Sequence, residues 1–343
     1  MAKEKKCPIV DIGGQAVMEG VMMKAPDAIA VAVRRPNGEI VVDRQTYKPV
    51  TDKHKWMKLP IIRGCVNMVS MLAMGMQVLT KSTEMLGIED EEPTKFEIWL
   101  SQKLGANIEK VVMAVAAVMA VALSLFLFVF LPSGAATLVQ HVTDNRIAIN
   151  LASGAVRIVI LVLYMWLIGF MPELRRVFQY HGAEHKTVYC HEAGLELTPE
   201  NARQFSRLHP RCGTAFILIT MIISILVGSV IDELIFLIFG IEKLSFLLRF
   251  GRSILLLPVV AGVAYEALKG LAHAGDHVIV RALRWPGLKL QLLTTREPDD
   301  SMLEVAIASM KAALDGVEAA APAKQYVKEE KDAPKGEQKA EQA

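Results

Sequence analysis

Apolar residues are concentrated in four long blocks between residues 110 and 271. The first block, 111–131, contains no charged residue and is followed by Pro132; the others cover about 147–171, 213–231 and 244–271. A helix needs roughly 20 apolar residues to cross a bilayer, and backbone groups in lipid must bond within their own segment. The pattern therefore predicts an α-helical integral membrane protein with a four-span region within residues 93–271.

The N-terminal part has a different pattern. Residues 28–34 and 39–47 are rich in β-branched residues, and Asn37-Gly38 lies between them, which is typical of a β-hairpin. Gly13-Gly14 and Gly20 punctuate an earlier apolar stretch, as expected for another strand or a tight turn. We expect residues 1–58 to form a small β-rich cytosolic segment.

Residues 59–86 are predicted to be an amphipathic helix. Polar residues recur every three or four positions and form one narrow stripe on an otherwise apolar surface. The uncharged part, 64–80, is marginal in length for a span, so an interfacial or re-entrant helix is favoured over a crossing one. An acidic break follows, and the unit is taken as 59–92.

Residues 272–318 are predicted to be a cytosolic C-terminal segment. The stretch Pro286–Leu293 is expected to be extended, and Asp299 or Asp300 is expected to cap a helix that runs to Ala313. The tail 319–343 consists mostly of Ala, Lys, Glu and Pro and is expected to be disordered.

Composition and charge narrow the function classes. Of the 343 residues, 52% are hydrophobic, and 38 basic residues oppose 36 acidic ones. This balance gives no reason to expect nucleic-acid binding. The connection 172–212 is rich in arginine and lysine, whereas 132–146 has one basic residue, so the positive-inside rule predicts a multi-pass protein with both termini and the 172–212 loop in the cytosol. No apolar stretch follows the basic start, so we expect insertion to rely on the internal spans.

The 172–212 loop carries the residues with the strongest chemical pattern. His181, Glu184 and His185 form an H-x-x-E-H sequence, whose members share one face of a helix. This spacing suits a zinc site with Glu184 as general base. The alternative is a set of hydrogen-bonding residues at the membrane interface.

A second cluster precedes the third span. His209 and Cys212 are ligand types that zinc accepts, and Arg211 lies between them. Because both clusters lie on one loop, His181, His185, His209 and Cys212 are predicted to converge as metal ligands. The alternative for the second cluster is a polar helix entrance with a buried thiol. Cys190 and His191, in the same loop, are spare candidates for the metal site, but a solvent-facing turn is the favoured interpretation for both.

Four further polar residues are candidates for a supporting shell. Arg157 and Glu266 lie within predicted spans, where charge is costly and must face protein or water. Glu266 is expected near the cytosolic end, as a ligand or as the partner of Arg157; the alternative is an interfacial side chain that reaches the headgroups. Gln15 and Glu19 are polar groups in an apolar context and are candidates for contact with the metal loop, against the alternative of a strand with one polar edge.

Four separated motifs give a family resemblance. GGQAVMEGVMMK (13–24), HGAEHK (181–186), HPRCGT (209–214) and LTTREPDD (293–300) together resemble the bacterial YqhQ-like membrane protein family, over about residues 8–315. Members of this family are commonly described as predicted metal-dependent enzymes, a description that is itself an inference. The resemblance implies a multi-pass protein of the bacterial cytoplasmic (inner) membrane, in which the His, Glu, Arg and Cys residues of these motifs belong to shared positions. It implies no substrate.

These observations lead to one main function and two alternatives. The main one is a membrane-embedded, zinc-dependent hydrolase at the cytosolic interface, in which Glu184 activates water and Arg211 steadies a developing negative charge. The expected cofactor is a divalent metal ion, with zinc favoured. The expected partners are the bilayer and a substrate that is either a lipid headgroup or a membrane protein, and the protein could also form oligomers. The alternatives are a membrane scaffold or assembly factor with a structural metal site, and an ion or lipid transporter.

Overall fold

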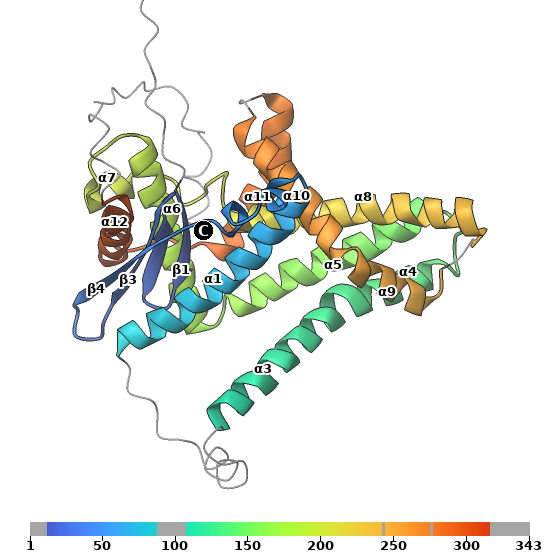
Figure 1. The fold of residues 1–343 in the computed structure, drawn as a ribbon, viewed down its shortest axis with the longest axis horizontal. Coiled ribbons are helices and arrows are strands. Elements are labelled where there is room, and N and C mark those ends of the chain that lie inside the picture. The colour runs from blue at the N-terminus through green and yellow to red at the C-terminus, as the bar shows by residue number, and fades with distance from the viewer. Residues whose placement is uncertain (1–11, 88–107, 242–243, 275–276, 316–343) are drawn as a thin grey trace, which may run out of the picture.

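In the computed structural model the chain is mostly helical and carries one four-stranded antiparallel sheet (Figure 1). The structure describes residues 12–87, 108–241, 244–274 and 277–315. The predicted acidic break and the tail 319–343 lie outside these residues. The strands are β1 (Gly13–Val17), β2 (Gly20–Lys24), β3 (Ala28–Arg34) and β4 (Ile40–Thr46). The helices that pack around them are α1 (Ile62–Leu86), α6 (Pro172–Glu192), α7 (Pro199–Arg203) and α12 (Asp300–Leu314).

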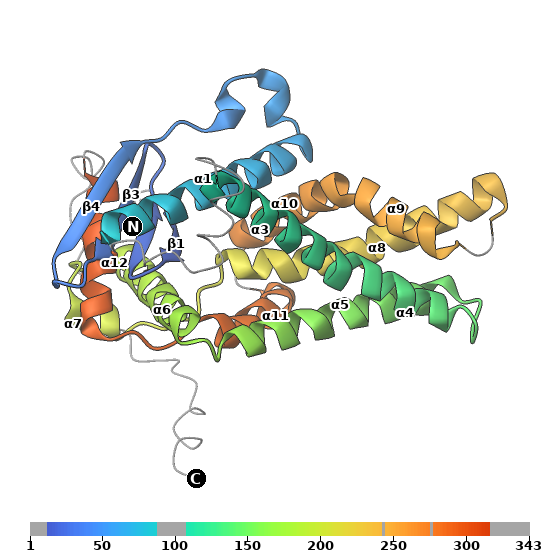
Figure 2. The same ribbon diagram turned by 90° about the horizontal axis from the view of Figure 1, so that it is seen from below.

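The other helices extend away from the sheet as a bundle. They are α3 (Ile108–Leu125), the π-helical segment η3 (Phe126–Phe130), α4 (Leu131–Val139), α5 (Arg146–Ile168), α8 (Gly213–Phe239), α9 (Phe246–Leu255), α10 (Leu257–His273) and α11 (Val278–Thr294). Two short 3-10 turns, η1 (Val50–Asp52) and η2 (Lys55–Lys58), connect the sheet to α1. Figures 1 and 2 show the sheet with α6, α7 and α12 at one end of the long axis, and α4 and α9 at the other.

The sheet is a meander in the order β1-β2-β3-β4. The predicted hairpin is confirmed as β3 and β4, which pair from Arg34 with Ile40 to Ala28 with Thr46. Gly38 in its turn has φ +89°, a conformation that glycine adopts without a Cβ clash. The earlier apolar stretch forms β1 and β2, paired in the tight register Val17 with Gly20.

Helices cover both faces of the sheet because successive strand residues point to opposite sides. Val21 and Met23 of β2 face α6 and α12 and join the larger core cluster. Val17 and Met22 face α1 and join a second cluster with Val78 of that helix. The sheet is therefore the middle layer of three. On one side of it, α6 packs against β1, β2 and α12.

The predicted helix 59–86 is confirmed as α1. Its C-terminal half buries Val78, Met85 and Leu86 against the sheet. Its N-terminal half crosses α10 so closely that a Cβ on Gly64 would lie 2.8 Å from the Cα of Gly262. Both ends of α1 therefore pack against other parts of the protein, while its middle exposes apolar side chains such as Leu72.

Among the described residues, four helical segments are long and apolar enough to cross a membrane: Ile62–Leu86, Ala114–Val139, Arg146–Ile168 and Phe216–Phe239. The pair α9 and α10 adds a fifth if this bent pair counts as one span. The two members are bent by 50° at a break before Pro258, which matches the proline inside the fourth predicted block. Pro258 has no N–H to donate to the carbonyl of Ile254, and its ring clashes with that carbonyl, so the break has a local cause.

Two predicted boundaries are wrong. The first apolar block does not stop at Pro132; helix continues to Val139, because η3 precedes the proline and Pro132 stands in the first turn of α4, where its missing N–H costs little. The predicted extended stretch Pro286–Leu293 is part of α11, with Pro286 inside the helix. Packing of Leu290 and Gln291, both buried, outweighs the hydrogen bond that Pro286 removes.

The last predicted helix is confirmed. Asp299 is the N-cap of α12, and its carboxylate accepts a hydrogen bond of 3.0 Å from the backbone N–H of Met302. The helix is buried along much of its length and forms part of the core under the sheet. This packing brings residues 294–299, which lead into α12, against α6.

Candidate metal centre

The H-x-x-E-H sequence lies on α6, which turns most of the predicted 172–212 loop into an ordered helix. His181, Glu184 and His185 are at positions i, i+3 and i+4, so they share one face. Residues 182–188 of this helix are all buried between the sheet and the chain around it. The spacing that the sequence displays is therefore held by a rigid element.

His181 is oriented at both ring nitrogens. Its Nδ1 lies 2.8 Å from the carbonyl oxygen of Thr294, and its Nε2 lies 3.3 Å from Sγ of Cys212. Because a carbonyl oxygen only accepts, Nδ1 must carry the proton that it donates. In the neutral ring this leaves a lone pair on Nε2, aimed at the thiol.

His185 is oriented in the same way. Its Nδ1 donates to the carbonyl oxygen of Arg207, and its side chain is 2% exposed. Burial lowers the pKa of His185, an effect that a hydrogen bond to Cys212 opposes. A neutral imidazole with a donated Nδ1 proton is the form in which histidine binds metal.

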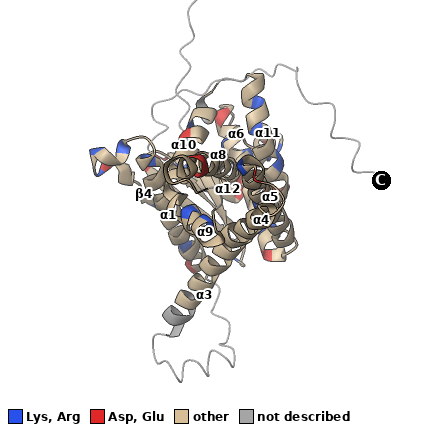
Figure 3. Cartoon of the chain, turned by 90° about the vertical axis from the view of Figure 1, so that its right-hand side faces the viewer, with Lys and Arg blue, Asp and Glu red and all other residues tan. Residues whose placement is uncertain are grey.

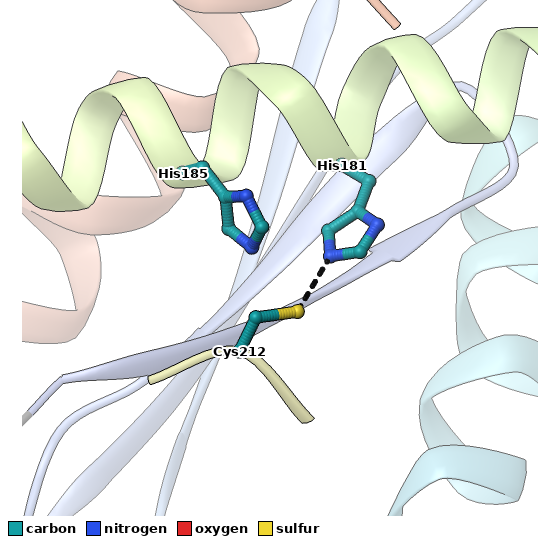
Figure 4. Close-up of side chains that lie close together, drawn as sticks. All are labelled: His181, His185 and Cys212. Atoms are coloured by element: carbon teal, nitrogen blue, oxygen red, sulfur yellow. Dashed lines mark hydrogen bonds between the residues drawn. The ribbon is translucent and has the colours of Figure 1, made fainter. Parts of the chain in front are cut away.

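Cys212 completes the group from a distant part of the chain. It is the N-cap of α8, and its Sγ accepts a bond of 3.5 Å from the backbone N–H of Thr214. One ligand atom each from His181, His185 and Cys212 lies within 4.8 Å of the other two. Figure 4 shows both imidazoles pointing from α6 toward the sulfur. The structure thus brings together three of the four predicted ligands.

The donor set fits a zinc ion. Two imidazole nitrogens and one sulfur are the ligand types that zinc prefers, at about 2.0–2.3 Å from the ion. Both imidazoles already donate their second nitrogen to backbone carbonyls, the outer-shell arrangement that metal-binding histidines commonly have. A zinc ion held by these three protein donors would have a fourth position for solvent or substrate.

Glu184 borders this group. Its Oε2 lies 3.5 Å from Nε2 of His185, and the side chain is 7% exposed. Burial raises the pKa of the Glu184 carboxyl, and His181 and His209 offset part of that rise. The carboxylate packs on the backbone of Gly14, where a Cβ would lie 2.5 Å from Glu184 Oε1. A side chain at position 14 of β1 would therefore displace the Glu184 carboxylate.

His209 lies beside the group but outside it. Its ring centroid is 5.7 Å from that of His185, and its Nε2 faces Glu192 at 3.3 Å. Gln291 of α11 holds its backbone, accepting from the N–H and donating to the carbonyl at 2.8 Å each. Arg211 also pairs with Glu192. The second cluster therefore contributes Cys212 to the centre, while His209 and Arg211 share a carboxylate next to it.

The two N-terminal candidates take different positions. Glu19, with φ +49°, accepts two hydrogen bonds from Arg176 and one of 3.3 Å from the hydroxyl of Tyr180. It thereby fixes the N-terminal half of α6, up to the residue before His181. Gln15 points to the opposite face of β1, where its Oε1 would lie 3.1 Å from a Cβ on Gly75. Glu19 supports the helix of the site, and Gln15 does not face it.

The two candidates within the bundle do not contact the three ligands. Glu266 forms a two-bond ion pair with Arg63 of α1 and so is neither the partner of Arg157 nor a ligand. Arg157 donates to the carbonyl oxygen of Phe128 and to Ser224. The expectation failed because a residue's depth along a span says nothing about the side of the helix from which a partner approaches.

Sequence reasoning assigned no role to the segment 294–298, although it lies in a motif that carries the family resemblance. Thr294 accepts the bond from His181, and the backbone N–H of Arg296 donates to the carbonyl of Phe178 at 2.8 Å. A Cβ on Gly182 would lie only 2.1 Å from the carbonyl oxygen of Arg296. These are backbone contacts, and the motif's side chains give no signal of them.

Cys190 is buried rather than in a solvent-facing turn, which corrects that prediction. It is 0% exposed and lies in the larger core cluster. Burial raises its pKa to about 11. At pH 8 only about one molecule in a thousand would carry the thiolate, which is the reactive form.

We therefore expect Cys190 to resist maleimide labelling at pH 8 in the folded protein and to react fully after denaturation. Mass spectrometry of peptides from labelled wild type, with Cys190→Ser as the control, measures this. Equal labelling rates before and after denaturation would contradict the burial of the thiol.

Comparisons with known proteins agree with the motifs. The profile of a family described as "Protein of unknown function (DUF1385)" matches residues 59–316. The chain is 34% identical over 314 residues to a protein of Bacillus subtilis (strain 168) named "Uncharacterized protein YqhQ", with 92% of this chain and 95% of the other covered. No solved structure matches the chain.

Proposed function

The chain belongs to the DUF1385 family, and we propose that it is a membrane-embedded hydrolase in which His181, His185 and Cys212 hold a divalent metal ion, zinc being favoured. One observation carries the proposal: a histidine nitrogen of His181 lies 3.3 Å from Cys212 Sγ, with His185 in the same group and Glu184 beside it. Three protein donors and a neighbouring carboxylate are the residues that zinc hydrolases use.

A bound zinc ion would supply Lewis-acid activation of water or of a substrate oxygen. The residues of the chain do the rest. Glu184 Oε2 accepts the proton that water loses and later returns it to the leaving group. Thr294 and the carbonyl of Arg207 keep both imidazoles in the tautomer that presents Nε2. Because His209 faces Glu192, the arrangement favours an open catalytic site over a closed structural one.

The same proposal includes the membrane. The candidate spans would cross the bacterial cytoplasmic membrane, with the arginine-rich connection 172–212 and both termini in the cytosol. The metal centre lies where α8 begins, at the sheet end of the bundle, and would then sit at the cytosolic interface. That position suits a substrate in the membrane itself, either a lipid headgroup or a membrane-protein segment. Arg211, 31% exposed, would meet a negatively charged group of that substrate.

Glu184→Gln tests the proposed base. We expect the variant to keep its metal and to lose hydrolysis by about 100-fold or more, because an amide cannot take the proton. The measurement is hydrolysis of a p-nitrophenyl acyl ester and a p-nitrophenyl phosphodiester in mixed micelles by the full chain in detergent, beside metal analysis of the same samples. Glu192→Gln is the matched control, since that carboxylate pairs with Arg211 and His209 outside the three-ligand group.

The outcomes separate the alternatives. Loss of metal from Glu184→Gln would make Glu184 a fourth ligand and would support the structural site of a scaffold. Metal-loaded wild type that hydrolyses neither ester, with Glu184→Gln unchanged in all respects, would remove the hydrolase proposal.

A further inference from the structure

A cavity that is open on one side lies between helices of the bundle, apart from the metal centre. Its volume is about 280 Å³, and segments η3, α5, α8, α9 and α10 line it. Its walls are mostly apolar, with Phe216, Ile217 and Met221 on α8. None of the residues of the metal centre lines it. Leu257, which is 48% exposed, borders the cavity at the break between α9 and α10 and marks a side toward the bundle surface.

Two irregular helical segments border the cavity. One is η3, whose π-helical turn contributes Phe128 and Val129 to the wall. The other is the break between α9 and α10, which contributes Leu256 and Leu257. Single π-turns often mark functional sites, and broken helices at membrane depth occur where backbone lines a cavity. Both irregular segments border the same cavity.

Arg157 is the polar group that reaches into this space without a carboxylate partner among the described residues. Its Nε donates to the carbonyl of Phe128 at 3.1 Å, and its Nη1 donates to Ser224 Oγ at 2.7 Å. These bonds fix the guanidinium against the cavity wall. They satisfy its hydrogens in part but do not neutralise its charge.

The neighbouring charges leave a positive excess. Arg252 lines the same cavity and pairs with Asp232, to which Arg249 Nη1 also lies close, at 3.6 Å. Asn150 donates to the same carboxylate at 2.9 Å. One carboxylate therefore serves two arginines, and Arg157 adds a third positive charge. In Figure 3 the bundle is otherwise mostly tan, with blue positions on α9. A buried positive excess is unfavourable, and an anion in the cavity would offset it.

We propose that this cavity binds an anionic amphiphile with one acyl chain, its phosphate or carboxylate at Arg157 and its chain along the apolar face of α8. The volume is near the lower end of small-molecule pockets, roughly 300–1,000 Å³, so it accepts one chain and not a whole two-chain lipid. The apolar wall excludes a free inorganic anion as the preferred occupant. The inference is independent of the metal centre.

Binding to the full chain in a non-ionic detergent tests this, by titration followed with native mass spectrometry. The probes are lysophosphatidic acid, oleate, lysophosphatidylcholine and inorganic phosphate. We expect at least one of the two anionic amphiphiles to bind about tenfold or more tightly than lysophosphatidylcholine, because a hydrogen bond between charged groups is stronger than one between neutral groups. Preference for lysophosphatidic acid or for oleate identifies phosphate or carboxylate as the anion.

The variants locate the site. Arg157→Gln should remove the preference for the anionic amphiphile, whereas Arg146→Gln should keep it, because Arg146 pairs with Glu233 and does not line the cavity. Thr220→Leu should weaken binding of every amphiphile by filling the cavity. Among the described residues, Thr220 Oγ1 donates to the carbonyl of Phe216 on its own helix. This second variant keeps the test valid if Arg157→Gln does not fold.

Three results would overturn the proposal. One is equal binding of the anionic and zwitterionic amphiphiles to wild type. Another is an unchanged preference in Arg157→Gln together with unchanged binding in Thr220→Leu. The third is binding of inorganic phosphate as tight as that of lysophosphatidic acid, because the apolar wall would then contribute nothing to binding.

Discussion

Replacing His181 and His185 together by alanine is expected to strip the purified protein of its divalent metal. Wild type should hold about one ion per chain and the double variant less than about a tenth of that, because one thiolate alone binds zinc weakly. The two imidazoles supply two of the three atoms that lie within 4.8 Å of one another. Elemental analysis of both proteins after desalting measures the difference.

His209→Ala is the matched control for this loss. Its Nε2 faces Glu192 and not the three-ligand group, so the variant should keep most of its metal. Cys212→Ser should lose metal and also lose the sulfur-to-metal absorption band of a cobalt-substituted sample. Equal metal content in wild type and in the double variant would contradict the proposed metal centre and, with it, the proposed hydrolase.

Gly182→Ala is expected to cause the largest loss of stability among single substitutions near the site. The added Cβ would lie 2.1 Å from the carbonyl oxygen of Arg296 and 3.3 Å from Cδ of Pro298. Because the Cβ would clash with a backbone atom, which cannot rotate away as a side chain can, α6 and the segment 294–298 must separate. We expect a loss of about 3 kcal/mol, and weaker metal binding as well, since separation also breaks the bond from His181 to Thr294.

Thermal unfolding of the protein in detergent, followed by tryptophan fluorescence, measures the effect. Gly134→Ala is the control, a helical glycine with no heavy atom within 4 Å of an added Cβ. It should leave the midpoint unchanged or raise it slightly, because alanine favours the helix. A Gly182→Ala midpoint equal to that of Gly134→Ala would contradict the close packing of α6 on this segment.

Local patterns carried the predictions that the structure confirms. The hairpin follows from Asn37-Gly38 between two β-branched runs, and α12 follows from a capping aspartate before an apolar helix. The shared face of His181 and His185 follows from helical spacing alone. In each case the physical cause acts over a few residues, so the sequence displays it directly.

The predictions that failed depend on distant partners. Glu266 was expected near Arg157 but binds Arg63, 203 residues away in the chain, because α1 crosses α10 at a pair of glycines. The stretch Pro286–Leu293 was expected to be extended, but it is part of α11, where the tertiary packing of Leu290 and Gln291 keeps Pro286 inside a helix. Local propensity is a weak prior wherever packing decides.

The sequence by itself determined the apolar segments, the small sheet and the residue types that a metal centre would use. Only the tertiary structure decided that Cys212 lies beside the two histidines while His209 faces Glu192. It also decided that Gly14 packs against the Glu184 carboxylate, that Gly182 packs against the backbone of Arg296, and that Arg157 borders a cavity. The physical reason is the range of the interactions. Hydrophobic periodicity and capping act within a few residues, whereas the orientation of a side chain is set by whatever the fold packs against it.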